Sequence, residues 1–242
     1  MNVDINTGGN AMNNFINGNN ALKQSNVIEF PKPKRKTNNY KVDEKQEVYP
    51  FKTEKDLKAM RNYFVEKKHY RDELMFILGI NIGLRAGDLL SLRWNQVLRE
   101  DKTVYEEITV KEEKTDKFRT FYLNNSCTAA ITAYFERLSS ENEVNLDSYI
   151  FSSRKGNTHI QVRSACNILK TAAKSVGIEY NVGTHSLRKT FGYHQLKAHA
   201  DDALFLCELQ EMFGHSSPKI TLRYCGLENE KMRQYYNDVS LL

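Results

Sequence analysis

A long apolar segment, LMFILGINI, stands within residues 71–82. Its apolar side chains fall on most sides of a helix rather than along one face, and a helix of that kind has to be buried. Gly83 follows it, and glycine readily ends a helix in a left-handed conformation. The segment therefore predicts a central core helix from Arg71 to Ile82, against which the other elements must pack.

The rest of the ordered pattern is mostly helical. Thr53 is a suitable N-cap, with Asp56 close behind it, for a helix that runs to about Lys68. Two segments rich in aromatic and β-branched residues, Tyr105–Val110 and Phe118–Leu123, flank the polar turn KEEKTDK and predict antiparallel strands. Further helices are expected near residues 126–139, 160–176, 186–198, 204–213, 217–223 and 227–238. The predicted fold class is mainly α with one small antiparallel β-sheet.

Residues 1–47 differ from the remainder of the chain. They are rich in Asn and Gly, have few apolar residues, and include the basic run Pro31–Lys36. This composition predicts a disordered tail. An alternative is that the basic run forms an arm that binds nucleic-acid phosphates. Residues 48–242 are expected to form the folded domain.

Charge and cysteine usage narrow the function classes only a little. The chain has 35 Lys and Arg against 30 Asp and Glu, so its net charge is +5, which is compatible with a polyanionic partner but does not require one. No stretch approaches the roughly 18 apolar residues of a membrane span, and the N-terminus lacks the pattern of a secretory signal. The four cysteines are widely spaced, which predicts neither a disulfide framework nor a zinc site and fits a reduced cytoplasm. They are Cys127, Cys166, Cys207 and Cys225.

Two segments in the first half of the chain carry cationic side chains in unusual places. Arg85 lies between two glycines just after the predicted core helix, where a charge is costly unless it is paired or faces a cleft. It could be held by Asp88 as a structural pair, or it could bind a ligand. Lys111, Lys114 and Lys117 lie on the predicted hairpin turn, where lysines are usually only solvated.

Two segments in the second half add histidine and tyrosine. His185 and Arg188, in THSLRKTFG, are three residues apart and so share one face at a helix start, which suits a phosphate. Either could instead be an ordinary surface residue. His215 follows Gly214, and Tyr224 comes nine residues later, although most of the 13 tyrosines in the chain must be structural.

Taken in order, these segments resemble the tyrosine recombinase or phage integrase family over residues 50–240. The shared order is an Arg, a hairpin Lys, an HxxR motif, a Gly-His pair and a Tyr nine residues after that His. The resemblance implies a site-specific DNA recombinase or integrase that cleaves and rejoins DNA through a 3′-phosphotyrosine, with chemistry like that of type IB topoisomerases.

The resemblance also implies a role for each site residue. Arg85 and Arg188 clamp the phosphate, and His215 donates a hydrogen bond to it. Tyr224 is the nucleophile and His185 is the general base. Lys114 fits the lysine that protonates the leaving 5′ oxygen, because KTDKFRTFYL is similar to the run around that lysine in the family. Lys111 and Lys117 are neighbours that could be mistaken for it.

The family needs no metal and no nucleotide cofactor. The implied partners are double-stranded DNA, further copies of the chain in a tetramer on DNA, and an accessory DNA-bending protein. The implied setting is the cytoplasm of a bacterium, associated with the nucleoid, and the origin is a phage or other mobile element.

The chain departs from the family at several places. Asp88 replaces the usual Glu that supports the arginine, Lys189 replaces a second His after HxxR, and Cys225 follows the tyrosine. Many members have a helical core-binding domain before the catalytic domain, whereas about 47 low-complexity residues precede it here, so the chain is expected to be a short member or a natural truncation. Tyr235 and Tyr236 are rival tyrosines whose distance from His215 does not fit the family.

Three questions stay open from the sequence. The helix predicted over residues 227–238 could dock on a neighbouring protomer or pack on the chain's own body. The chain could be a non-catalytic DNA-binding regulator on the same fold. It could also be a helical interaction protein whose Arg and His residues are only structural, which predicts no salt-dependent binding to DNA.

Overall fold

The computed structural model describes residues 47–114, 116–227, 233 and 236–238. These residues belong to one compact unit, Glu44–Leu242. The predicted tail lies outside the described residues except for Glu47, and most of the helix predicted over residues 227–238 lies outside them too. In the described ranges no helix is both long enough and apolar enough to cross a membrane.

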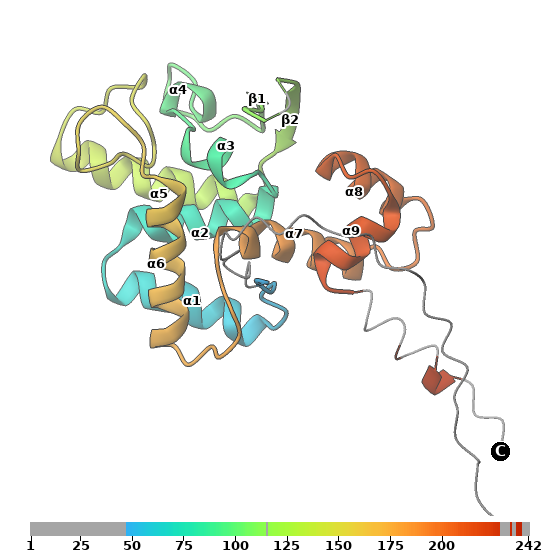
Figure 1. Ribbon diagram of the computed structural model, residues 1–242. Helices are drawn as coiled ribbons and strands as arrows, with labels where there is room; N and C mark the ends of the chain where they lie inside the picture. Colours follow the sequence, from blue (N-terminus) through green and yellow to red (C-terminus); the bar gives the residue numbers. More distant parts are fainter. Residues whose placement is uncertain (1–46, 115, 228–232, 234–235, 239–242) are drawn as a thin grey trace, which may run out of the picture. The chain divides into compact units, whose positions relative to one another are not determined.

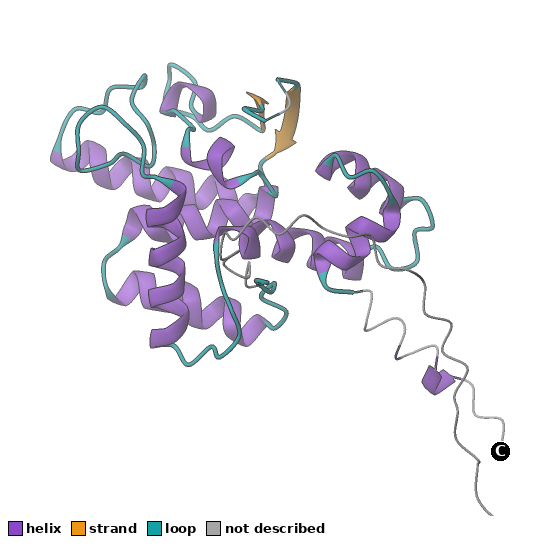
Figure 2. Ribbon diagram, in the orientation of Figure 1, coloured by secondary structure: helices purple, strands orange, loops and turns teal. Residues whose placement is uncertain are grey.

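The architecture is mainly helical with a single described two-stranded sheet (Figure 2). The first half contains helices α1 (Glu54–Glu66), α2 (Tyr70–Ile82), α3 (Ala86–Leu90) and α4 (Trp94–Val97), and then strands β1 (Glu107–Lys111) and β2 (Phe118–Tyr122). The second half contains α5 (Asn125–Glu141), α6 (Val162–Ser175), α7 (Thr184–Ala198), α8 (Phe205–Phe213) and α9 (Pro218–Cys225). The predicted fold class is confirmed. The helices α3 and α4 were not predicted, because they are too short to show a helical period in the sequence.

Helix α2 is the centre of the main hydrophobic core, as its all-round apolar sequence predicts. It packs against α1, α5 and α7 (Figure 1). Its C-cap, Gly83, has φ +62°, a left-handed conformation that favours glycine. Gly79 faces α7 so closely that an added Cβ would lie 2.5 Å from Leu187 Cδ1. The lack of a side chain at Gly79 therefore sets how near α7 approaches α2.

The N-terminal cap of α1 is also as predicted, because Thr53 Oγ1 accepts a hydrogen bond from the backbone N–H of Asp56 at 3.1 Å. The hairpin pairs Glu107 with Tyr122 and Lys111 with Phe118 in antiparallel register. Each strand begins and ends within two residues of its predicted limits. The turn between them lies against α3, where the backbone N–H of Glu113 donates to Asp88 Oδ1.

A second, smaller hydrophobic cluster joins α7, α8 and α9. Its buried members are Phe191, Leu209, Phe213 and Cys225, and Tyr224 packs against them. Gly192 allows this approach, since a Cβ there would lie 2.5 Å from Cys225 Sγ. The cluster fixes α9 beside the start of α7 and so brings Tyr224 to the HxxR segment.

Candidate active site

Two arginines from distant segments converge on one backbone carbonyl. Arg188, on α7, is 4% exposed and donates from Nη1 to Gly83 O at 2.5 Å and from Nη2 to Phe213 O at 3.1 Å. Arg85, the N-cap of α3, donates from Nη2 to Phe213 O at 3.5 Å. Burial lowers the pKa of Arg188 to about 10, so the side chain stays charged at neutral pH. The pair can therefore present fixed positive charge to an anion.

Tyr224 lies on α9, half-buried, with its hydroxyl beside the first turn of α7. Its Oη atom is 3.4 Å from His185 Nδ1, and its ring is 5.0 Å from the ring of His215 in an edge-on arrangement. Burial raises the pKa of Tyr224 to about 12, and the positive charge of Arg188 partly opposes that rise. The hydroxyl is therefore protonated at neutral pH and needs a base to become a nucleophile.

Both histidines next to Tyr224 are shifted towards the neutral form. His185 is exposed at the surface, yet partial desolvation is the first cause that lowers its pKa, followed by the charges of Arg188, Lys189 and Lys114. The pKa of His215 is lowered by burial first, and then by Arg188 and Arg85. A neutral imidazole can accept a proton. Both the position of His185 and its neutral form therefore suit a general base for Tyr224.

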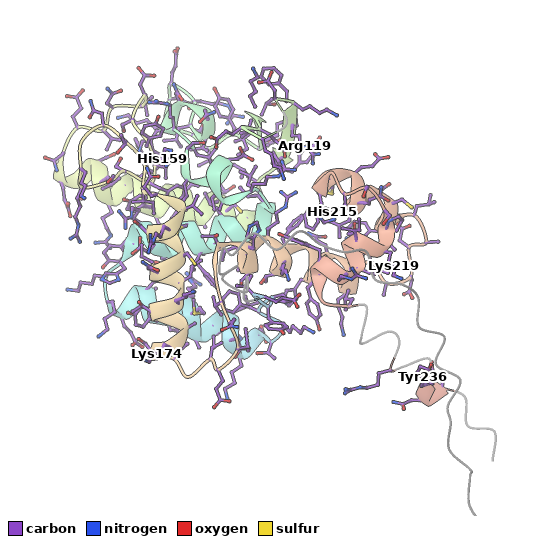
Figure 3. All side chains as sticks on the ribbon, in the orientation of Figure 1. Arg119, His159, Lys174, His215, Lys219 and Tyr236 are labelled. Atoms are coloured by element: carbon purple, nitrogen blue, oxygen red, sulfur yellow. The ribbon has the colours of Figure 1, made fainter. Side chains whose placement is uncertain are left out.

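His215 is held in place by its backbone and its ring. The segment lies between α8 and α9, and Figure 3 labels the residue there. Its backbone N–H donates to Gln210 O at 3.0 Å, and Gln210 Nε2 donates to His215 O at 3.0 Å. Its ring Nδ1 lies 3.0 Å from Oγ1 of the buried Thr221. This contact orients the ring and leaves Nε2 as the second polar atom of the imidazole.

The hairpin turn brings a lysine to the same place. Lys114 is exposed, and its charge is one of the causes that lower the pKa of His185. Lys111, by contrast, forms an ion pair with Asp116 at 2.7 Å. The structure thus gives Lys114 an electrostatic link to the cluster and gives Lys111 a separate partner.

The family model described as the phage integrase family matches residues 50–231, which is most of the chain. The chain belongs to the phage integrase family. The probable integrase/recombinase YoeC of Bacillus subtilis is 35% identical over 189 residues, which are 78% of this chain and 95% of YoeC. The tyrosine recombinase XerC of Leptospira interrogans is 26% identical over 211 residues, which are 86% of this chain and 61% of XerC.

Solved structures of tyrosine recombinases share the fold. The XerA recombinase superposes with a TM-score of 0.61 at 23% identity, over 80% of this chain and 65% of XerA. The XerH recombinase bound to its difH substrate superposes with a TM-score of 0.58 at 18% identity, over 76% of this chain and 51% of XerH. The chain thus spans less than two thirds of the Xer recombinases that it matches, and nearly all of YoeC.

All six residues predicted for the site of this phage integrase family member lie in one region. Hydrogen bonds, ring contacts or charge effects link five of them to one another. The sixth, Lys114, is linked to them because its charge lowers the pKa of His185. The six are Arg85, Lys114, His185, Arg188, His215 and Tyr224. The rival Tyr236 is 79% exposed. Among the described residues, no group of three His, Cys, Asp or Glu side chains could hold a metal ion.

Of the two alternatives left open for Arg85, an ion pair with Asp88 is not the one found. Asp88 does not pair with it; its Oδ1 accepts the backbone N–H of Glu113 at 3.0 Å, which holds the start of the hairpin turn. The carboxylate that pairs with Arg85 Nη1 is Glu112, whose side chain is fully buried. Burial raises the pKa of Asp88 above its usual value, and the hydrogen bond from Glu113 partly offsets the rise. Asp88 therefore holds the hairpin turn by a hydrogen bond and affects Arg85 through its charge.

Three residues of the site escaped the sequence analysis: Glu112, Arg119 and Thr221. Glu112 stands in a charged turn and looks solvated. A signal was nevertheless present, because Ile108 and Val110 alternate inward on β1 and the same period of two carries Glu112 to the buried face. Arg119 and Thr221 have no comparable signal, since their partners come from other segments.

Proposed function

We propose that the chain is a site-specific recombinase or integrase that cuts double-stranded DNA and rejoins it through a 3′-phosphotyrosine at Tyr224. The observation that carries this is the hydroxyl of Tyr224, 3.4 Å from a histidine that is shifted towards its neutral form. Two buried or half-buried arginines and a second histidine lie around it. Phosphoryl transfer needs this combination of a nucleophile, a base and fixed cations.

The proposed step is an in-line displacement at the scissile phosphorus. A bond forms between Tyr224 Oη and phosphorus while the bond to the 5′ oxygen breaks. The phenol proton passes to His185, and Lys114 protonates the departing 5′ oxygen. Arg85 and Arg188 stabilise the charge that develops on the non-bridging oxygens, and His215 donates to the same phosphate.

The reverse step restores the DNA. A 5′ hydroxyl attacks the phosphotyrosine, the bond to Tyr224 breaks, and the proton returns to the phenolate. The phosphodiester energy is kept in the tyrosyl ester throughout, so the cycle uses no nucleotide. This is the chemistry type of type IB topoisomerases, and the residues proposed for it all lie within residues 48–242, the proposed catalytic domain.

The proposed partners follow from the same reaction. Exchange of strands between two duplexes needs a set of active sites, so we infer a homo-oligomer, a tetramer on DNA. An accessory DNA-bending protein and a cytoplasmic, nucleoid-associated setting belong to the proposal too. XerH was solved on its difH substrate, and XerA and XerC are recombinases by name, which supports DNA as the ligand class.

The decisive experiment is the capture of a covalent adduct on a suicide substrate. The binding site is first selected from a randomised duplex library with Tyr224→Phe, which retains every charged group of the site. A duplex with that site and a nick near the cut lets the short 5′ product diffuse away, so the tyrosyl ester accumulates. We expect a protein–DNA adduct on a denaturing gel with the wild-type chain and none with Tyr224→Phe.

A second tyrosine serves as the matched control. Tyr236→Phe removes one hydroxyl from an exposed side chain and is expected to leave adduct formation unchanged. Salt-sensitive binding without any adduct would favour a non-catalytic DNA-binding regulator. An absence of DNA binding would favour a helical interaction protein, and an adduct that persists in Tyr224→Phe would assign the nucleophile to another residue.

A further inference from the structure

Three arginines, not two, donate hydrogen bonds to backbone carbonyls at the C-terminal end of α8. Arg85 and Arg188 share Phe213 O, and Arg119 Nη1, from β2, donates to the neighbouring Met212 O. Figure 3 shows Arg119 on the hairpin and His215 on the segment that follows α8. The last carbonyls of a helix lack partners within the helix and carry partial negative charge, so guanidinium groups suit them. The residue two positions beyond Phe213 is His215.

A buried carboxylate ties the third arginine to the first. Glu112 is 0% exposed, forms an ion pair with Arg85 Nη1, and has Oε1 3.3 Å from Arg119 Nε. A carboxylate in such a place is retained only if cations compensate it. The chain of contacts therefore runs from Arg85 through Glu112 and Arg119 to Met212 O.

Gly214 is shaped to admit this arrangement. It is the C-cap of α8 with φ +63°, and a Cβ on it would lie 3.1 Å from Arg119 Nη2 and 3.6 Å from Arg85 Nη2. Two guanidinium groups thus approach the backbone that leads to His215 from the same side. The Gly of the Gly-His pair is needed both for its backbone conformation and for this approach.

We propose that Arg119 and Glu112 are positioning residues for the cleavage reaction, and this rests on the proposed function. Arg119 uses Nε for Glu112 and Nη1 for Met212 O, so it is anchored to the protein on two sides. Through Glu112 it fixes the guanidinium of Arg85, and through Met212 O it fixes the backbone that carries His215. The pair preorganises two phosphate-binding groups, Arg85 and His215, that are far apart in the sequence.

The first test is single-turnover cleavage of the suicide substrate by Arg119→Gln. We expect the rate constant for adduct formation to fall by about 10- to 100-fold, because small misplacements of reacting groups have effects of this size. DNA affinity is expected to stay within about threefold of wild type, since no phosphate contact is removed. A variant that merely folded poorly would lower the amplitude of adduct formation and leave its rate constant unchanged.

Two comparisons separate positioning from general damage. Arg61→Gln removes another Arg–Glu ion pair, with Glu73, and is expected to retain the wild-type rate constant. In an Arg85→Lys background, Arg119→Gln is expected to cause much less than its single effect, because residues that act through one another are not additive. Full additivity of the two changes in the free energy of activation contradicts the proposed path through Arg85.

The second test does not depend on activity. The chain has six histidines, and ¹³C-labelled histidine gives one ring resonance for each, with His215 assigned by His215→Gln. We expect Arg119→Gln to move the His215 resonance and to leave that of His159, on another loop, in place. An unmoved His215 resonance, or an unchanged rate constant in an active chain, overturns the positioning role. A wild-type chain without any adduct refutes the proposed function, and the resonance still decides the positioning.

Discussion

Desolvation displaces the pKa values of Tyr224 and of the two neighbouring histidines in opposite directions. It raises the pKa of Tyr224 to about 12, because the charged form of a phenol is its deprotonated form. It lowers the pKa values of His185 and His215, because the charged form of an imidazole is its protonated form. At neutral pH the tyrosine therefore holds the proton and His185 is free to take it.

Lys189 tests this balance, since it stands where many family members have a histidine. Its ammonium lies 5.5 Å from the centre of the Tyr224 ring and forms an ion pair with Glu47 at 3.2 Å. Its positive charge is one of the causes of the lowered pKa of His185, after burial and Arg188 and before Lys114. Lys189→Met removes that charge, so we expect the pKa of His185 to rise.

The rise in the pKa of His185 also predicts the direction in which the pH dependence of activity changes. A higher pKa keeps His185 protonated up to a higher pH, so the acidic limb of the cleavage rate profile should move to higher pH in Lys189→Met. The measurement is an NMR titration of His185 together with the pH dependence of single-turnover cleavage. Lys197→Met, on the same helix but against the Tyr193 ring, is the control and should leave both unchanged. A shift of the limb to lower pH contradicts the argument.

The crossing of the helices α2 and α7 affects the site, because Arg188 follows Leu187 directly. An added methyl at Gly79 would meet both Cδ1 and Cβ of Leu187, at 2.5 and 2.9 Å. Leu187 Cβ cannot turn away, so the helices would have to separate. Overpacking of this kind costs ~1–3 kcal/mol.

Gly79→Ala is therefore expected to destabilise the chain despite its better helix propensity. The propensity gain is about 1 kcal/mol, so the free energy of unfolding should fall by up to ~2 kcal/mol. Denaturant unfolding of Gly79→Ala, Leu187→Ala and the double variant measures it. Leu187→Ala removes Cδ1 but keeps Cβ, so Gly79→Ala should cost less in that background than in the wild-type chain. An equal loss in both backgrounds speaks against the close approach.

In the folded unit as a whole, the site lies where two hydrophobic clusters meet. The main core contains α2 and the hairpin, and the smaller cluster joins α7, α8 and α9. Arg188 spans the boundary, since it donates to Gly83 O on one side and to Phe213 O on the other. The strong hydrogen bonds of the site therefore also hold the two clusters together.

The basic run near the N-terminus makes a prediction for the entire chain. DNA affinity should fall as salt rises, with a slope of about 0.9 for each neutralised phosphate. We expect the slope to be unchanged when Lys32, Lys34, Arg35 and Lys36 are replaced by Gln, because the composition of residues 1–47 predicts a tail. The measurement is the affinity for the selected duplex at several salt concentrations. A slope smaller by about 0.9 per replaced charge would show that the run is an arm on DNA.

Local chemistry was enough to predict much of this protein. The all-round apolar segment predicted α2, Gly83 its end, and Thr53 the start of α1, because periodicity and caps depend on neighbours in the sequence. His185 and Arg188 share a helix face for the same reason. The order of the motifs then pointed to the phage integrase family, and with it to the six candidate residues.

Only the tertiary structure decided how those six residues are supported. Glu112 replaces Asp88 as the partner of Arg85, and Arg119 reaches a carbonyl 93 residues away. Whether a carboxylate is buried and compensated depends on cations from segments that are distant in the sequence. No local sequence pattern indicates that such cations will lie beside it. Local chemistry therefore determined the longer helices and the hairpin, and the order of the motifs gave the candidate residues, whereas long-range packing determined which charges surround them.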